Sequence, residues 1–294
     1  MQITNKDLKR IIQEELQAVL REEEEEAISL TDEDWQQIAE FIKSGDEQYY
    51  NQAFFFAEDG GEEALNKVAD MIYKRDSGKG LIYLLKKSEE YGAFSLFPSI
   101  TTLDLFNNKL SSLPESIENL TNLTELDLSI NKLSELPESI GNLNNLTKLN
   151  LSGNKFSSLP DWIGNLTNLT KLYLNKNELS SLPESIGNLS NLTTLLLWEN
   201  KLSSLPESIG NLNNLTTLHL GYNQLSSLPE SIGNLKNLTK LDLNRNQLPS
   251  LPESIGNLKN LQVLLLPAHL ISDTAEINRL RELLPNTRIQ RFKM

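Results

Sequence analysis

One phrase recurs through the C-terminal two-thirds of the chain at a constant step. It reads LPESIENL from Leu113, LPESIGNL from Leu136 and LPDWIGNL from Leu159, and then LPESIGNL four more times, each start 23 residues after the last. A repeat of this length indicates a solenoid, in which each unit packs only on its neighbours. The period therefore constrains the fold more than any other feature of the sequence.

A second pattern lies between these phrases. Every unit reads L-x-x-L-x-L-x-x-N-x-L, for example at Leu169, Leu172, Leu174, Asn177 and Leu179. The alternation x-L-x-L predicts a short strand, and stacked repeats bury leucines that one repeat leaves exposed. Eight parallel strands about 4.8 Å apart make a sheet roughly 34 Å long. The recurring asparagines are predicted to form a structural ladder that satisfies backbone groups at a tight bend: Asn108, Asn131, Asn154, Asn177, Asn200, Asn223 and Asn246.

These motifs resemble the leucine-rich-repeat family, in its intracellular and bacterial class with the 23-residue consensus LPxxIgNLxxLxxLxLxxNxL. The resemblance covers roughly two-thirds of the chain, and an eighth unit departs from it with His269 in the asparagine position. It implies an α/β solenoid, a horseshoe with a parallel sheet on its concave side. It also implies a binding scaffold rather than an enzyme. The near-identical repeats and the lack of cysteine indicate a bacterial source.

Four segments are expected along the chain. Residues 1–26 combine an amphipathic helix at 4–21 with a run of five glutamates, and residues 27–97 form a small all-α capping domain. The repeats occupy 98–271, and a C-terminal cap occupies 272–294. In the capping domain, Thr31 and Asp34 form a helix start of capping-box type, and further helices are expected at about 47–58, 62–75 and 79–91. In the C-terminal cap, Ser272 is expected to begin a helix that Pro285 ends.

Composition limits the partners and the compartment. The chain has no cysteine, which excludes disulfides and thiolate sites and fits a reducing compartment. The net charge is −13, which disfavours nucleic acid and anionic membranes as partners. No stretch has the roughly 20 apolar residues of a membrane span, and the first residues lack a secretory h-region. We therefore expect a cytoplasmic protein.

The repeats differ mainly at the positions around the strand leucines, whose side chains should point to the concave face. Aromatic and charged residues gather there in the middle units, and tyrosine, tryptophan and arginine are enriched at binding hot spots. The predicted partner-binding residues are Tyr173, Lys176, Leu196, Trp198, Glu199, His219, Tyr222, Asp242, Arg245, Phe106 and Ile130. Scattered surface residues are the alternative interpretation. Trp162, on the descending side, either packs on its neighbouring repeat or marks another interface.

The sequence offers little for catalysis or metal binding. His219 and Asp242 are neighbours in one row, but no nucleophile lies near them, and Asp104, Asp127 and Asn150 supply too few oxygens to cage calcium. We therefore expect no enzyme activity, no cofactor and no metal. The favoured function is binding another protein or peptide on the concave face. Two alternatives remain, which are self-assembly through residues 4–21 and carbohydrate binding by the concave aromatic residues.

Overall fold

The computed structural model describes residues 30–45, 47–75, 79–92 and 97–290. The chain divides into two compact units, of which one holds Met1–Leu84 with Phe94–Leu96 and the other holds Leu85–Ala93 with Phe97–Met294. We call them the helical unit and the repeat array. The predicted helix at 4–21 lies outside the described residues.

The helical unit consists of short helices packed on a small apolar core. Helix α2 begins as predicted, because the Thr31 side chain accepts from the backbone of Asp34 while the Asp34 carboxylate accepts from the backbone N–H of Thr31 at 2.8 Å. It ends at Gly45, which has the left-handed φ of 72° that favours glycine. The helices are α2 (Asp32–Ser44), α3 (Glu47–Ala57) and α4 (Gly61–Arg75), with a 3₁₀ turn η1 (Glu58–Gly60). The first part of α5 (Lys79–Tyr91) also belongs to this unit, and its residues from Leu85 onward belong to the repeat array.

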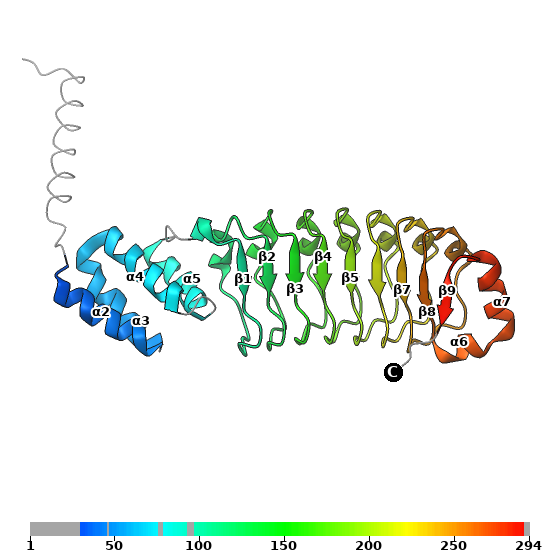
Figure 1. The fold of residues 1–294 in the computed structure, drawn as a ribbon, viewed down its shortest axis with the longest axis horizontal. Coiled ribbons are helices and arrows are strands. Elements are labelled where there is room, and N and C mark those ends of the chain that lie inside the picture. The colour runs from blue at the N-terminus through cyan, green and yellow to red at the C-terminus, as the bar shows by residue number, and fades with distance from the viewer. Residues whose placement is uncertain (1–29, 46, 76–78, 93–96, 291–294) are drawn as a thin grey trace, which may run out of the picture. The chain divides into compact units, whose positions relative to one another are not determined.

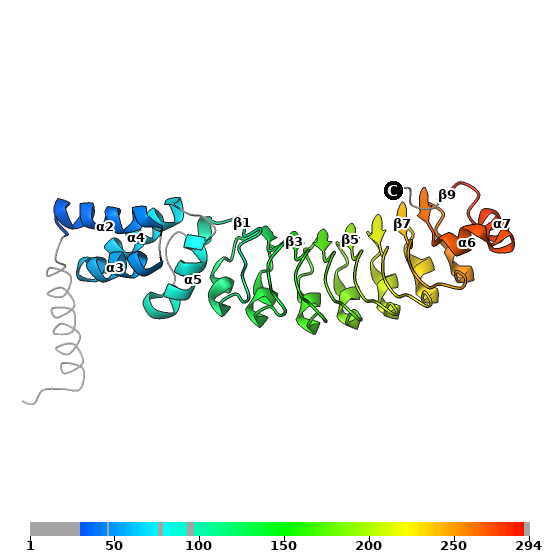
Figure 2. The same ribbon diagram turned by 90° about the horizontal axis from the view of Figure 1, so that it is seen from below.

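The repeat array forms one parallel sheet of nine strands in chain order among the described residues. Figure 2 shows that the array bends with the strands on its inner side and the 3₁₀ turns on its outer side. The strands are β1 (Thr102–Asp104), β2 (Glu125–Asp127), β3 (Lys148–Asn150), β4 (Lys171–Tyr173), β5 (Thr194–Leu196), β6 (Thr217–His219), β7 (Lys240–Asp242), β8 (Val263–Leu265) and β9 (Arg288–Gln290). This confirms the predicted solenoid (Figure 1).

Each LPxxI phrase folds into a 3₁₀ turn after its proline. The turns are η3 (Glu115–Asn119), η4 (Glu138–Asn142), η5 (Asp161–Asn165), η6 (Glu184–Asn188), η7 (Glu207–Asn211), η8 (Glu230–Asn234) and η9 (Glu253–Asn257), and η2 (Phe97–Ser99) precedes the first repeat. Neighbouring turns approach very closely. A Cβ added to Gly187 would lie 2.6 Å from the carbonyl oxygen of Ser208 on the next turn, so this position requires glycine.

The asparagine ladder joins successive repeats as predicted. Asn200 is typical, because its Nδ2 donates to the carbonyls of Leu174 and Leu197, both at 2.9 Å, and its Oδ1 accepts from the N–H of Leu179 at 3.1 Å. Asn108 is only half-buried, since it belongs to the first repeat. In the eighth repeat His269 takes over the link to the preceding unit, and its Nε2 donates to the carbonyl of Leu248 at 2.6 Å.

Both ends of the array have a cap within this unit. At the start, the end of α5 contacts the first repeat, where Ser116 Oγ donates to the Leu85 carbonyl and Asn119 Nδ2 donates to Ser88 Oγ at 3.3 Å. At the other end, helices α6 (Ala268–Ser272) and α7 (Thr274–Leu283) precede β9, which pairs with β8.

The predicted N-cap Ser272 is wrong by one residue. Ser272 is the last residue of α6, and the carboxylate of Asp273 accepts from the backbone N–H groups of Ala275 and Glu276. Aspartate is as good an N-cap as serine, and it lies where α6 has already ended. The short helix α6 was not expected from the sequence.

Candidate partner-binding face

The strands present two side chains of every three to the concave face. In β4 the central Leu172 is fully buried, while Lys171 and Tyr173 on either side of it point outward. The strands are in register, so equivalent residues form rows across the sheet, and Tyr173 lies beside Leu196, which lies beside His219. The rows that the sequence predicts therefore run along one continuous face.

Two aromatic side chains, Trp198 and Tyr222, lie in the middle of this face, and we call them the aromatic cluster. Trp198 is half-buried, and the ammonium of Lys176 lies 5.0 Å from the centre of its ring. Lys176 also pairs with Glu199, with 3.7 Å between Nζ and Oε2. Further along, the guanidinium of Arg245 lies 5.6 Å from the centre of the Tyr222 ring. Each aromatic ring is thus held beside a cation from a neighbouring repeat, which orders both side chains.

A row of left-handed residues borders the cluster. Lys176, Glu199 and Tyr222 have φ between 55° and 57°, a region that few residues other than glycine adopt. The backbone N–H of Lys176 donates to the carbonyl of Trp198 at 3.0 Å, and Glu199 and Tyr222 donate likewise to the next repeat. The other members of the row are Asn107, Ile130, Gly153 and Arg245. The sequence pattern was not used to predict this left-handed conformation. Asn107 and Gly153, which occupy the same row, are residue types that favour it.

Two exposed apolar side chains lie at the start of the face. Phe106 is 55% exposed and Ile130 is 45% exposed. Ile130 combines a β-branched side chain with a φ of 55°, which is a strained combination. Its side chain covers Gly153 of the next repeat, because a Cβ added there would lie 2.6 Å from Ile130 Cδ1.

The far end of the face is closed. Asp242 and Leu265 are each only 5% exposed, so Asp242 offers little surface to a partner. Its carboxylate accepts from the backbone N–H of Asn244 at 3.0 Å and from the Asn244 side chain. Asp242 is therefore the one buried member of the predicted set, and the other ten residues are at least partly exposed.

His219 sits at the edge of the aromatic cluster without the hydrogen bond to Asp242 that their adjacency suggests. Burial lowers the pKa of His219, and Lys240 lowers it further, while Asp242 acts in the opposite direction. Its Nε2 is buried and has no hydrogen-bond partner within the described part of the chain. The Oδ1 atom of Asn175, in the repeat that contains β4, is likewise buried and has no hydrogen-bond partner among the described residues. Buried polar atoms usually have partners, but the serine hydroxyls of several outer turns are buried in the same way, so these two atoms do not mark a site by themselves.

The acidic row at the start of the sheet is held by amides rather than by a cation. Asn150 Nδ2 donates to Asp127 Oδ2 at 2.9 Å, and Asp104 accepts from the N–H of Phe106 at the same distance. Across the residues that the structure describes, no group of three or more histidine, aspartate or glutamate side chains is arranged to hold a metal ion.

Trp162 packs on its neighbour. It lies half-buried in η5, and a Cβ added to Gly141 on the preceding turn would be 3.5 Å from its Cβ and Cε3. The turns are farther apart here than at the serine-containing units, because the indole needs the room. This arrangement favours the packing interpretation of Trp162.

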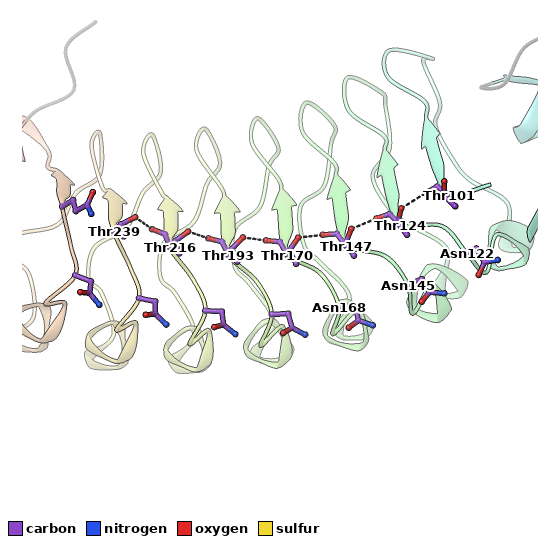
Figure 3. Close-up of a pocket in the computed structure, with 15 residues that line it drawn as sticks. Thr101, Asn122, Thr124, Asn145, Thr147, Asn168, Thr170, Thr193, Thr216 and Thr239 are labelled. Atoms are coloured by element: carbon purple, nitrogen blue, oxygen red, sulfur yellow. Dashed lines mark hydrogen bonds between the residues drawn. The ribbon is translucent and has the colours of Figure 1, made fainter. Parts of the chain in front are cut away.

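A trough of about 1270 Å³ runs along the edge between the strands and the 3₁₀ turns, and it was not expected from the repeat pattern. Figure 3 shows its threonines linked in a chain, in which each hydroxyl donates to the threonine carbonyl of the preceding repeat, as Thr170 does to Thr147 at 3.0 Å. A parallel row of asparagines does the same, for example Asn168 to Asn144 at 2.7 Å. These donors serve the stacking of the repeats, and the lining hardly varies from unit to unit.

The comparisons with known proteins agree with this geometry. Leucine-rich-repeat families match nearly all of the array, with a leucine-rich repeat region at residues 100–178, one leucine-rich repeat family at 190–248 and 213–271, and another at 168–189. The chain belongs to the leucine-rich-repeat family. Such domains generally mediate contact between proteins and are typically not enzymes. No curated protein matches the chain.

Two solved leucine-rich-repeat structures are similar, and both come from bacteria. The leucine-rich-repeat protein LIC12759 of Leptospira interrogans is 35% identical with a TM-score of 0.54, over 72% of this chain and 56% of its own. Internalin C2 of Listeria monocytogenes is 26% identical with a TM-score of 0.56, over 67% of this chain and 82% of its own. The chain thus spans little more than half of the Leptospira protein. No helix among the described residues is both long and apolar enough to cross a membrane.

Proposed function

We propose that the concave face between Phe106 and Arg245 docks a partner protein, and that the protein works as a non-enzymatic scaffold in the cytoplasm. The observation that carries the proposal is the aromatic cluster. Trp198 and Tyr222 stand on the open side of a sheet whose leucine core is complete without them. Aromatic residues beside ordered cations are typical of binding hot spots.

The polar surroundings of the cluster support the same proposal. Lys176 and Glu199 lie beside the ring of Trp198 and are about half exposed, so a partner that covers the ring also meets these two charges. The left-handed row fixes the backbone beside them, so Lys176 and Glu199 are presented in a defined direction. A preorganised surface loses less conformational entropy when it binds.

The experiment is capture from the native lysate with the full chain as bait. The test variant carries Tyr173→Ala, Trp198→Ala and Tyr222→Ala, and the matched control carries Trp162→Ser, which removes an aromatic residue from the opposite side and restores the serine of the other repeats. We expect one specific protein to be retained by the wild type and the control and lost by the triple variant. Retention by the triple variant at unchanged thermal stability contradicts the proposal.

A further inference from the structure

The charges on the concave face are separated by sign along the array. Its first two strands, each taken with the three residues that follow it, carry three acids, Asp104, Glu125 and Asp127, and no base. The repeats from β3 to β7 carry five bases against two acids: Lys148, Lys171, Lys176, Lys240 and Arg245 against Glu199 and Asp242. The whole protein has a net charge of −13, so a basic region on this face runs against the general composition.

The unpaired charges show the separation most clearly. Lys148 pairs with Glu125, with 3.1 Å between Nζ and Oε2, and this contact raises the pKa of Lys148. Among the residues that the structure describes, Lys171, Lys240 and Arg245 form no ion pair. Asp104 and Asp127 form none either, and they accept hydrogen bonds from neutral groups only.

Like charges also lie side by side in the register of the sheet. Asp104 is the direct neighbour of Asp127, and Lys148 is the direct neighbour of Lys171. Like charges in directly opposed positions destabilise a sheet. These two contacts do not stabilise the fold. A bound partner removes both repulsions when its basic groups lie over the aspartates and its acidic groups lie over the lysines.

Distance keeps the two ends electrically independent. At about 4.8 Å per strand, β2 with Glu125 and Asp127 lies roughly 10 Å from β4 and 24 Å from β7, and β1 lies one strand farther away. The screening length in physiological salt is about 8 Å. The acids at the start therefore neutralise only part of the field above Lys171, and almost none of the field above Lys240 and Arg245.

We propose, as a deepening of the proposed function on which it rests, that the face binds an elongated segment of a partner protein in one orientation. The acidic part of that segment lies over β4–β7, and an apolar side chain within this part contacts Leu196 and Trp198. Its basic part lies over Asp104 and Asp127. Complementary charge patterns of this kind fix the register and raise the association rate.

The test pans a random peptide display library on the full-length protein. We expect enriched peptides that carry a basic block and, apart from it, an acidic block that includes an apolar residue. The variant Lys171→Glu/Lys240→Glu should stop selecting the acidic block and should bind a wild-type-selected peptide at least about tenfold more weakly. The matched control is Lys155→Glu/Lys259→Glu, which changes the charge equally at exposed positions off this face and should behave like the wild type.

Each other outcome is decisive. Peptides that depend on Tyr173 and Trp198 but show no separation of charge overturn this inference and leave the proposed function standing. Peptides that ignore all the face variants, or no enrichment at all, overturn both. A dimer of the wild type in sedimentation velocity that the Lys171→Glu/Lys240→Glu variant dissociates makes a second copy of this chain the occupant, which overturns the inference.

Discussion

The ammonium of Lys176 lies 5.0 Å from the centre of the Trp198 ring and 3.7 Å from the carboxylate of Glu199, all on the concave face. Lys176 and Glu199 are about half exposed, so water and salt weaken their ion pair. The three side chains hold one another in place more than they stabilise the fold. Their arrangement therefore matters more for binding than for the stability of the fold.

Replacement of Lys176 by methionine separates these two roles. We expect the free energy of unfolding to change by less than about 0.5 kcal/mol, because exposed ion pairs contribute little. We expect binding of the captured partner to weaken by about 1 kcal/mol, because Trp198 loses the cation that orders it. Denaturant unfolding and titration calorimetry measure the two quantities. A loss of stability without a loss of affinity would show that Lys176 is structural.

The asparagine ladder predicts a large and position-dependent effect. Asn200→Ala removes two donated hydrogen bonds and leaves the buried N–H of Leu179 without its acceptor. We expect a loss of about 3 kcal/mol in the free energy of unfolding. Asn108→Ala, at the half-buried first position, should cost about 1 kcal/mol. Equal losses at both positions in urea unfolding would contradict the ladder as the source of stability.

The close approach of the 3₁₀ turns gives a matched pair of glycine variants. Gly187→Ala places a Cβ 2.6 Å from the Ser208 carbonyl oxygen, and we expect a loss of about 1–3 kcal/mol. Gly141→Ala meets only ordinary contacts of 3.5 Å with Trp162, and its effect should stay below about 0.5 kcal/mol. Thermal unfolding of both variants checks the difference. A stable Gly187→Ala protein would mean that the turns are free to move apart.

The C-terminal cap predicts a dependence of stability on pH. Glu276 is 8% exposed, and its hydrogen bonds with Arg279 hold the pKa of its carboxylate below the ordinary value of 4.5, with help from the N–H of Leu251. A lowered pKa means that the carboxylate stabilises the fold above about pH 4.5 and loses this contribution as the pH falls through the folded-state pKa.

Glu276→Gln tests this sign. We expect the wild type to be more stable than the variant at pH 7, and the difference to shrink as the pH falls below 4.5. Glu178→Gln is the control, because the exposed pair of Glu178 with Lys201 contributes little at any pH. A difference between wild type and Glu276→Gln that stays constant from pH 7 to acid would exclude the carboxylate as the cause.

The repeat pattern predicts most of this fold because each position has one role in every unit. Seven units share the leucines, the ladder asparagine and the LPxxI segment that forms the 3₁₀ turn. A wrong assignment in one unit is therefore corrected by comparison with the others. The helix starting after Thr31 is equally local, since its capping box needs only two residues that are three apart in the sequence. Ser272 failed because the choice between it and Asp273 depends on where α6 ends, which the sequence does not mark.

The candidate site is harder to predict because its properties depend on neighbouring repeats. The sequence indicates which side chains share the face, but not that Lys176 lies over Trp198 or that Asp242 is closed off by Asn244. The left-handed row was hidden because its residue types vary, with lysine, glutamate and tyrosine in a conformation usual for glycine. Here the hydrogen bond to the next repeat fixes the backbone more strongly than the residue type does.

Photo-crosslinking from single positions in the full chain tests whether a partner covers the concave face of the array, with the reactive residue at Thr194 on that face or at Asn188 on the outer turn of the same repeat. We expect a crosslinked partner from position 194 and none from position 188. Crosslinking from position 188 alone would contradict this expectation.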